Sequence, residues 1–165
     1  MKAKNYRRTT GQVYTRDEYI RSVPDSRVQK YTMGTYRDDY THIVNLLSKM
    51  TLQIRDMALE SARITAGKIL TAKLEDRYFL ELKSHPHNVL RENKMLFGAH
   101  ADRLQEGMRR AFGKAVGKAA RVQAEQPVLS VRVYEDGVDV AKEALTLASK
   151  KLPKSYSVRI TSIAA

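Results

Sequence analysis

Apolar residues recur with period two in several short segments of the chain, and this pattern predicts β-strands. One alternating segment begins near Arg27, and a second begins near Thr41. The second segment is apolar on both faces, since Ile43 and Val44 are neighbours, so we expect that strand to be buried on both sides. The sequence GTYRDDY between the two segments has the composition of a turn.

Two longer segments show helical periodicity instead. The first runs from an expected N-cap at Thr51 to about Leu74, and the second runs from about Val138 to Leu152, where Pro153 ends it. In each segment, apolar and small residues recur every three or four positions and form one stripe. The first stripe comprises Ile54, Ala58, Ala62, Thr65, Ile69 and Ala72, and the second comprises Ala141, Ala144, Leu145, Ala148 and Leu152.

Further strands are expected in the second half of the chain. They cover Tyr78–Ser84, the segment after Pro86, residues 118–123, residues 128–134 and the segment from Tyr156. Residues 98–117 contain four glycines, and we expect no regular structure there. The order of strands and helices predicts an α+β fold, with two helices on one face of a mostly antiparallel sheet.

The charge balance favours a polyanionic partner. The chain of 165 residues carries 30 Lys and Arg against 18 Asp and Glu, a net charge of +12. Nucleic acid is the first candidate for such a surface, and an anionic membrane is the second. The chain has no Cys, no apolar run long enough to span a bilayer, and no apolar segment behind its first charges. These features fit an intracellular protein without a secretory signal.

The first 26 residues differ in composition from the domain expected at 27–165. Cations and tyrosines alternate there without helical or strand periodicity. We expect a basic arm that becomes ordered only against a partner, because Arg and Tyr suit phosphates and bases. The alternative is a solvated tail without a binding role.

The sequence GMRRAFGKAVGKAARV, from Gly107 to Val122, contains five cations, three glycines and no acid. Glycine allows the backbone to approach a phosphate closely, so a flexible basic loop at about 101–119 is expected to contact nucleic acid. Met108, Phe112 and Val116 lie among the cations. The alternative for these apolar residues is that the loop folds back onto its own core.

Enzymatic chemistry finds little support in the sequence. Gly113 and Gly117 are separated by three residues and Ala119 follows Lys118, so a nucleotide-binding P-loop is excluded by both spacing and the missing hydroxyl. His85 and His87 could share one face of a strand, but no acidic or Cys ligand has matching spacing. We therefore expect no metal, no cofactor and no catalytic residue.

Several motifs resemble one family. VLRENKM (89–95), AxADRLQxGMRxAFGKxxGxxARV (99–122) and ALTLASKKLPKSYSVRI (144–160) are similar to the universal large-subunit ribosomal protein family called L-sixteen in bacteria and L-ten-e in archaea and eukaryotes. The segment YRRTTGQVYTRDEYIRSVPD (6–25) resembles the archaeal and eukaryotic form. The resemblance covers nearly the whole chain and favours an archaeal-type member.

The resemblance implies an α/β-hammerhead type of α+β domain in the cytoplasmic large ribosomal subunit. Its partners would be large-subunit rRNA, the tRNAs in the A and P sites near the peptidyl-transferase centre, and neighbouring ribosomal proteins. No membrane and no homo-oligomer is expected. The family's role is structural, and the alternative is an RNA-binding regulator or chaperone outside the ribosome.

The resemblance, together with the charge pattern, assigns two sets of candidate residues. The expected rRNA-binding set is Lys4, Tyr6, Arg7, Arg8, Arg16, Arg21, His85, His87, Arg91, Lys94 and Arg121. The expected tRNA-proximal loop set is Arg103, Met108, Arg109, Arg110, Phe112, Gly113, Lys114, Gly117 and Lys118. Arg110 and Lys118 stand where the family usually has uncharged residues, which makes this loop more basic.

Overall fold

A five-stranded antiparallel sheet forms the larger part of the molecule. A computed structural model describes residues 6–7, 9, 17–99, 105–109 and 111–163. The sheet has the strand order β1-β4-β7-β2-β8. Its strands are β1 (Thr32–Gly34), β4 (Tyr78–Leu82), β7 (Pro127–Val133), β2 (His42–Ser48) and β8 (Tyr156–Ser162).

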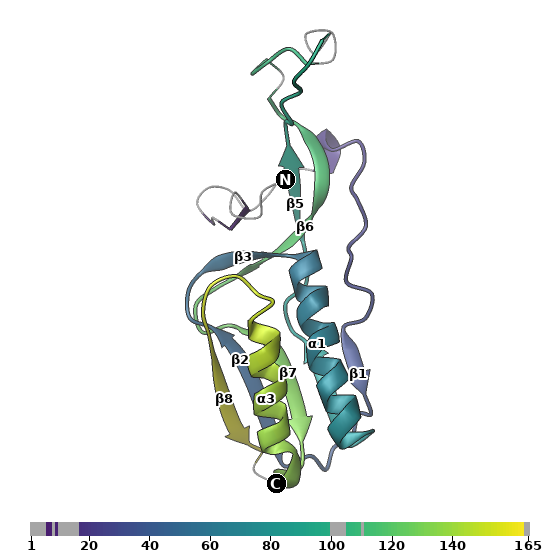
Figure 1. Ribbon diagram of the computed structural model, residues 1–165, viewed down its shortest axis with the longest axis vertical. Coiled ribbons are helices and arrows are strands. Elements are labelled where there is room, and N and C mark those ends of the chain that lie inside the picture. The colour runs from purple at the N-terminus through teal and green to yellow at the C-terminus, as the bar shows by residue number, and fades with distance from the viewer. Residues whose placement is uncertain (1–5, 8, 10–16, 100–104, 110, 164–165) are drawn as a thin grey trace.

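Two helices, α1 (Asp56–Leu74) and α3 (Val138–Ser149), lie side by side on one face of this sheet (Figure 1). The predicted α+β class and the mostly antiparallel pairing are therefore confirmed. The core between helices and sheet is fully buried at Leu46, Leu70, Leu129 and Leu145. We call this unit the helix-covered sheet.

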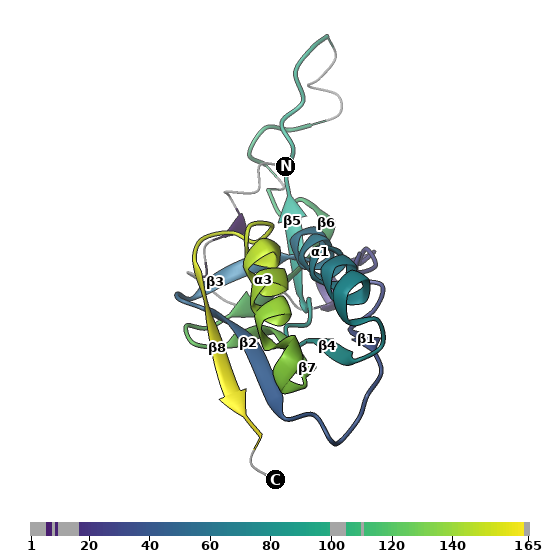
Figure 2. The same cartoon turned by 60° about the horizontal axis from the view of Figure 1, so that its bottom comes forward.

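A second, three-stranded antiparallel sheet continues the molecule beyond the helices. It comprises β3 (Leu52–Arg55), β6 (Lys114–Val122) and β5 (Asn88–Glu92), with β6 in the middle. Strands β5 and β6, with the described residues between them, form a hairpin that projects away from the helices (Figures 1 and 2). We call the described residues 88–99, 105–109 and 111–122 the β5–β6 hairpin.

The start of the first helix was predicted wrongly. Residues Leu52–Arg55, which we had expected inside the helix, form β3, and α1 begins at Asp56. The Asp56 carboxylate accepts a hydrogen bond from the Met57 backbone N–H at 2.8 Å and a second from the Arg27 N–H at 3.1 Å. An acid at this end also interacts favourably with the helix dipole. Three successive buried residues, from Leu52 to Ile54, explain why helical periodicity could not distinguish strand from helix there.

The predicted stripe of α1 was correct only in part. Ala62 is buried, but Thr65 is partly exposed and Ala72 is exposed. The helix buries a face offset from the prediction, formed by Asp56, Leu59, Ala62, Arg63, Ala66, Gly67, Leu70 and Leu74. The offset follows from extending the helix through Ile54, which is in fact a strand residue. In α3, by contrast, Ala141, Ala144, Leu145 and Ala148 are buried as predicted.

Two strand boundaries and the number of sheets also differ from expectation. The strand expected near Arg27 begins at Thr32, although the Tyr31 carbonyl already accepts a hydrogen bond from Leu82 N–H at 2.7 Å. Strand β6 begins at Lys114 rather than at residue 118. Residues 114–119, the last part of the expected loop, therefore pair with β5 or β3. A single sheet had been expected, and the structure has two.

Candidate nucleic-acid interface

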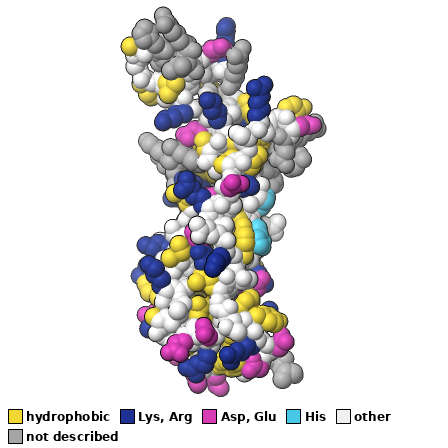
Figure 3. Space-filling view, turned by 90° about the vertical axis from the view of Figure 1, so that its right-hand side faces the viewer, with side chains coloured by type: hydrophobic (Ala, Val, Ile, Leu, Met, Phe, Trp, Pro, Cys, Tyr) yellow, Lys and Arg dark blue, Asp and Glu magenta, His cyan; other side chains and the backbone are white. Residues whose placement is uncertain are grey.

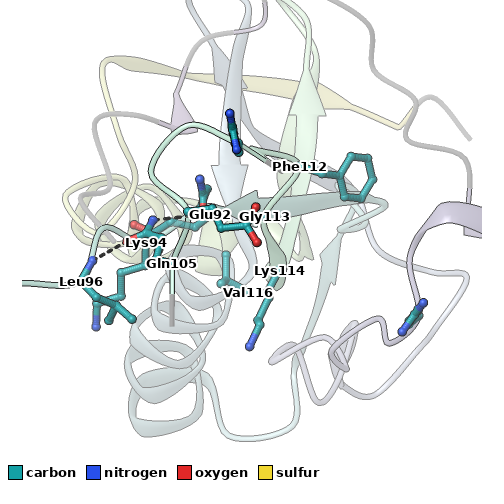
Figure 4. A pocket seen from close by; sticks show the side chains of 12 residues that line it. Glu92, Lys94, Leu96, Gln105, Phe112, Gly113, Lys114 and Val116 are labelled. Carbon is teal, nitrogen blue, oxygen red and sulfur yellow. Dashed lines mark hydrogen bonds between the residues drawn. The ribbon is translucent and has the colours of Figure 1, made fainter. Parts of the chain in front are cut away.

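The two ends of the loop between β5 and β6 are joined by side-chain hydrogen bonds. The Gln105 amide donates to Asn93 Oδ1 at 3.3 Å and accepts from the Leu96 backbone N–H at 2.7 Å (Figure 4). The Asn93 amide also donates to the Gly107 carbonyl at 3.3 Å. These bonds connect residues 93–96 to residues 105–107. The described part of the loop therefore has a defined shape close to the strands.

Arg91 fixes the loop where it enters β6. Its guanidinium donates a hydrogen bond to the Phe112 carbonyl at 2.8 Å and lies over the Phe112 ring, 3.8 Å from the centroid. The next residue, Gly113, has φ of +77°, and a Cβ there would lie 2.6 Å from the Glu92 carbonyl carbon. Only glycine fits such a close approach with a left-handed backbone. The chain can therefore turn into β6 directly beside β5.

Large apolar side chains remain exposed on the hairpin. Phe97 is 90% exposed and Met108 is 79% exposed, while Leu96, Phe112 and Val116 are each exposed by between 40% and 47%. These described residues do not fold back onto the core, which was the alternative for Met108, Phe112 and Val116. Exposed apolar and aromatic side chains among cations are typical of surfaces on which unpaired bases stack.

The described ion pairs of the molecule all lie outside the hairpin. Among the residues that the structure describes, five ion pairs join Arg63 to Glu60, Lys73 to Glu143, Lys83 to Glu81, Lys142 to Asp139 and Arg159 to Glu125. None of these pairs lies in the hairpin. Lys94, Arg109, Lys114 and Lys118 form no ion pair with any described acid. Acidic side chains are most frequent at the end of the molecule opposite the hairpin tip, as Figure 3 shows.

Gln53 attaches the described residues of the N-terminal arm to the three-stranded sheet. It lies on β3 with 6% of its surface exposed. Its side-chain amide donates to the Tyr6 carbonyl at 2.7 Å and accepts from the Asn88 amide at 2.6 Å. Its backbone N–H donates to the Arg7 carbonyl at 3.2 Å. One buried side chain thus connects the arm, β3 and β5.

Two further contacts support the docked arm. Arg121 on β6 donates a hydrogen bond to the Thr9 carbonyl, and the Tyr6 hydroxyl donates to the Arg91 carbonyl at 3.5 Å. Burial, followed by the charge of Glu92, raises the pKa of Tyr6, so this phenol stays protonated. The arm had been expected to become ordered only against a partner. Tyr6, Arg7 and Thr9 contact the chain's own strands.

The structure gathers part of the predicted site around one hollow of the hairpin. Arg21, Lys94, Arg109, Phe112, Gly113 and Lys114 all line it. Gly117 and Lys118 lie further along β6, and Met108 is exposed on the loop. Arg91 and Arg121 are engaged with backbone carbonyls of the chain itself. Lys4, Arg8, Arg16, Arg103 and Arg110 lie outside the described residues.

His85 and His87 lie just before β5, away from the hollow. The His85 ring packs against Tyr31 with centroids 4.4 Å apart, and the His87 backbone N–H donates to the Ala119 carbonyl at 3.1 Å. Both side chains are exposed. Among the described residues there is no group of three or more His, Cys, Asp or Glu placed to hold a metal ion. No helix in the described part of the chain is long and apolar enough to cross a membrane.

Sequence reasoning missed the polar residues that organise this region. Gln53, Asn88, Asn93 and Gln105 are uncharged and were not among the candidates. Gln53 carried one usable signal, because it is a polar residue between Leu52 and Ile54 in a short apolar segment. Such a residue, once buried, needs hydrogen-bond partners. Its partners are distant in sequence, so the local pattern could not name them.

Comparison with known proteins gives the family. The family model for ribosomal protein L16p/L10e matches residues 2–159. The chain belongs to the L16p/L10e family of ribosomal proteins. This family consists of structural proteins rather than enzymes, in agreement with the expectation from the sequence.

The relatives in this family include archaeal proteins of similar length. The chain is 49% identical over 152 residues to the large ribosomal subunit protein uL16 of Hyperthermus butylicus, covering 92% of this chain and 84% of that protein. It is 48% identical to the protein of the same name from Staphylothermus marinus, over 92% of this chain and 87% of that one. For the Sulfolobus acidocaldarius protein the identity is 44%, with 96% and 92% covered. The predicted archaeal-type resemblance is confirmed.

Proposed function

We propose that this protein is a structural constituent of the large ribosomal subunit in the cytoplasm, where its arm and β5–β6 hairpin bind large-subunit rRNA. Residues 101–119 would lie near the tRNAs of the A and P sites and the peptidyl-transferase centre and support tRNA positioning. Neighbouring ribosomal proteins would contact other faces of the domain. On this proposal the domain is of the α/β-hammerhead type. Membership of the L16p/L10e family supports the ribosomal role.

The distribution of charge partners is the observation that carries the rRNA interface. Five described cations in or around the helix-covered sheet pair with acids, whereas Lys94, Arg109, Lys114 and Lys118 on the hairpin have no described acidic partner. Each Lys or Arg that contacts a phosphate releases counterions, so such cations dominate both affinity and its salt dependence. The exposed Phe97 and Met108 add surface on which bases can stack.

A salt titration with two matched variants tests this interface. The variant Lys114→Gln with Lys118→Gln removes two hairpin cations, and the control Lys73→Gln with Lys142→Gln removes two cations of the helices. Affinity for archaeal large-subunit rRNA is measured across a range of salt concentrations. We expect the slope of log K against log salt to fall by roughly 0.7–0.9 for each lost phosphate contact in the hairpin variant. The helix variant should keep the wild-type slope.

Equal slopes in the two variants would contradict the hairpin interface. Residency in the ribosome is tested separately, by sedimenting a cell lysate and probing the large subunit after a salt wash. About one copy per particle supports the structural role. A protein that sediments free would favour the alternative of a non-ribosomal RNA-binding regulator or chaperone.

A further inference from the structure

A hollow of about 800 Å³ lies beside the base of the loop in the β5–β6 hairpin. Its wall is formed by both ends of the loop, by the start of β6, and by Arg21 from the arm. Figure 4 shows Lys94, Leu96 and Gln105 on one side of it and Lys114 and Val116 on the other. Hollows of this size are typical of sites for small ligands.

The lining combines four cations with an apolar surface. Arg21, Lys94, Arg109 and Lys114 are all exposed, so their charged groups can reach an anion without loss of a described ion pair. Leu96, Phe112 and Val116 supply the apolar part. A ligand that matches this lining has a flat apolar portion and a negative group attached to it.

The polar groups that shape the hollow are already engaged within the chain. Gln105 uses its amide nitrogen on Asn93 and its amide oxygen on Leu96 N–H. The Arg91 guanidinium lies over one face of the Phe112 ring, and its Nη1 donates a hydrogen bond to the Phe112 carbonyl. The loop ends are therefore positioned before any ligand arrives, which lowers the conformational cost of binding.

We propose that this hollow is a binding site for one unstacked RNA nucleotide. The base would pack on Leu96, Phe112 and Val116, and the phosphate would contact the surrounding cations. The proposal rests on the proposed rRNA interface and adds a specific subsite to it. Bases that leave a helical stack bind apolar and aromatic side chains, while Lys and Arg bind the backbone. An acidic peptide fits less well, because its short carboxylate side chains would leave the apolar lining of Leu96, Phe112 and Val116 uncovered. Glu92 and Glu106, which also line the hollow, repel the negative group of either ligand.

Two doubly substituted proteins distinguish binding of a base in the hollow from general electrostatic attraction of RNA. Leu96→Ala with Val116→Ala removes apolar surface from the hollow at residues 41% and 40% exposed. Ile160→Ala with Ile163→Ala is the matched control, because Ile160 on β8 and Ile163 directly after it are 38% and 37% exposed. Both variants keep every charge, and equal thermal melting of the two confirms that both remain folded.

The probes are a short single-stranded oligoadenylate with one central 2-aminopurine, and inorganic polyphosphate, which has no bases. Fluorescence of 2-aminopurine rises when the base leaves its neighbours, so it reports an unstacked nucleotide directly. We expect wild type and control to raise this fluorescence. The hollow variant should lose the rise and bind the RNA at least about fivefold more weakly, with unchanged affinity for polyphosphate.

The proposed nucleotide site is wrong if the hollow variant retains the fluorescence rise, or if it loses RNA and polyphosphate affinity to the same extent. Tight RNA binding by wild type without any fluorescence rise would also contradict the nucleotide site, but it would remain consistent with the proposed rRNA interface. A wild-type protein that binds neither probe would overturn both. Tighter binding to a polyglutamate peptide than to RNA would identify an acidic peptide as the occupant instead.

Discussion

The helix-covered sheet and the β5–β6 hairpin use the same kinds of residue in opposite ways. In the helix-covered sheet, Leu and Val side chains are buried between helices and strands, and surface cations such as Lys73 and Lys142 are paired with acids. In the hairpin, Phe97 and Met108 face outward, and Lys94, Arg109, Lys114 and Lys118 have no described acidic partner. The first arrangement stabilises the fold, and the second leaves binding surface unused by the chain itself.

The residues that stabilise the fold and the residues available for binding therefore lie in different parts of the molecule. Burial of apolar surface contributes most of the favourable free energy of folding. The base of the hairpin contributes to this burial through Leu90, Ala120 and Val122, but the described residues near its loop contribute little, because their large apolar side chains are exposed. Its shape depends instead on a few hydrogen bonds, on Gly113 and on the attachment of the arm through Gln53. Substitutions in the two regions should therefore have different consequences.

The largest expected effect on stability lies in the helix-covered sheet. Leu145→Ala removes a fully buried side chain of α3 and should lower the free energy of unfolding by about 2–5 kcal/mol. Met108→Ala, at a residue 79% exposed, should change it by no more than about 0.5 kcal/mol. Thermal and urea unfolding of both variants provide the measurement. A comparable loss in the two variants would mean that the loop packs against the core.

An intermediate effect is expected at Gln53. Gln53→Ala removes the partners of the Tyr6 carbonyl and the Asn88 amide, which should cost about 1–3 kcal/mol in buried hydrogen bonding. The arm should then detach, so limited trypsin digestion should cut after Arg7 faster than in wild type. The control Gln123→Ala changes the same residue type at an exposed position. Unchanged digestion of Gln53→Ala would show that the arm does not depend on this side chain.

The helix-covered sheet could largely be predicted from the sequence, and the reason is local periodicity. The buried stripe of α3 has helical spacing within a dozen residues, and β7 alternates Leu129, Val131 and Val133 over five residues. Both signals are complete within one element. The start of α1 was predicted wrongly because β3 ends at Arg55 and α1 begins at the next residue, Asp56, without a Gly or Pro to mark the boundary.

The hairpin could be predicted only as a basic, glycine-containing segment. Its cations and glycines are visible in composition, but the first residues of β6 pair with a strand that precedes them by more than twenty residues. Hydrogen bonds such as that from Asn88 to Gln53, 35 residues apart, cannot be inferred from either segment alone. The polar residues that organise the interface were therefore missed, while several that line the hollow were found.

The smallest expected effect on the melting of the helix-covered sheet, and the sharpest test of the hairpin, comes from comparing Gly113, directly before β6, with Gly117 within it. Gly113→Ala places a Cβ 2.6 Å from the Glu92 carbonyl carbon at φ of +77°, whereas a Cβ at Gly117 meets no atom within 4 Å. A left-handed conformation costs a non-glycine residue about 1–2 kcal/mol before any clash. Gly113→Ala should therefore open the pairing of Glu92 with Lys114, measured by amide hydrogen exchange, and weaken RNA binding while the melting of the helix-covered sheet stays unchanged. Gly117→Ala should preserve all three properties. A loss of strand pairing in Gly117→Ala would show that the pairing of β6 needs the conformational freedom of glycine in general, rather than the close approach at Gly113.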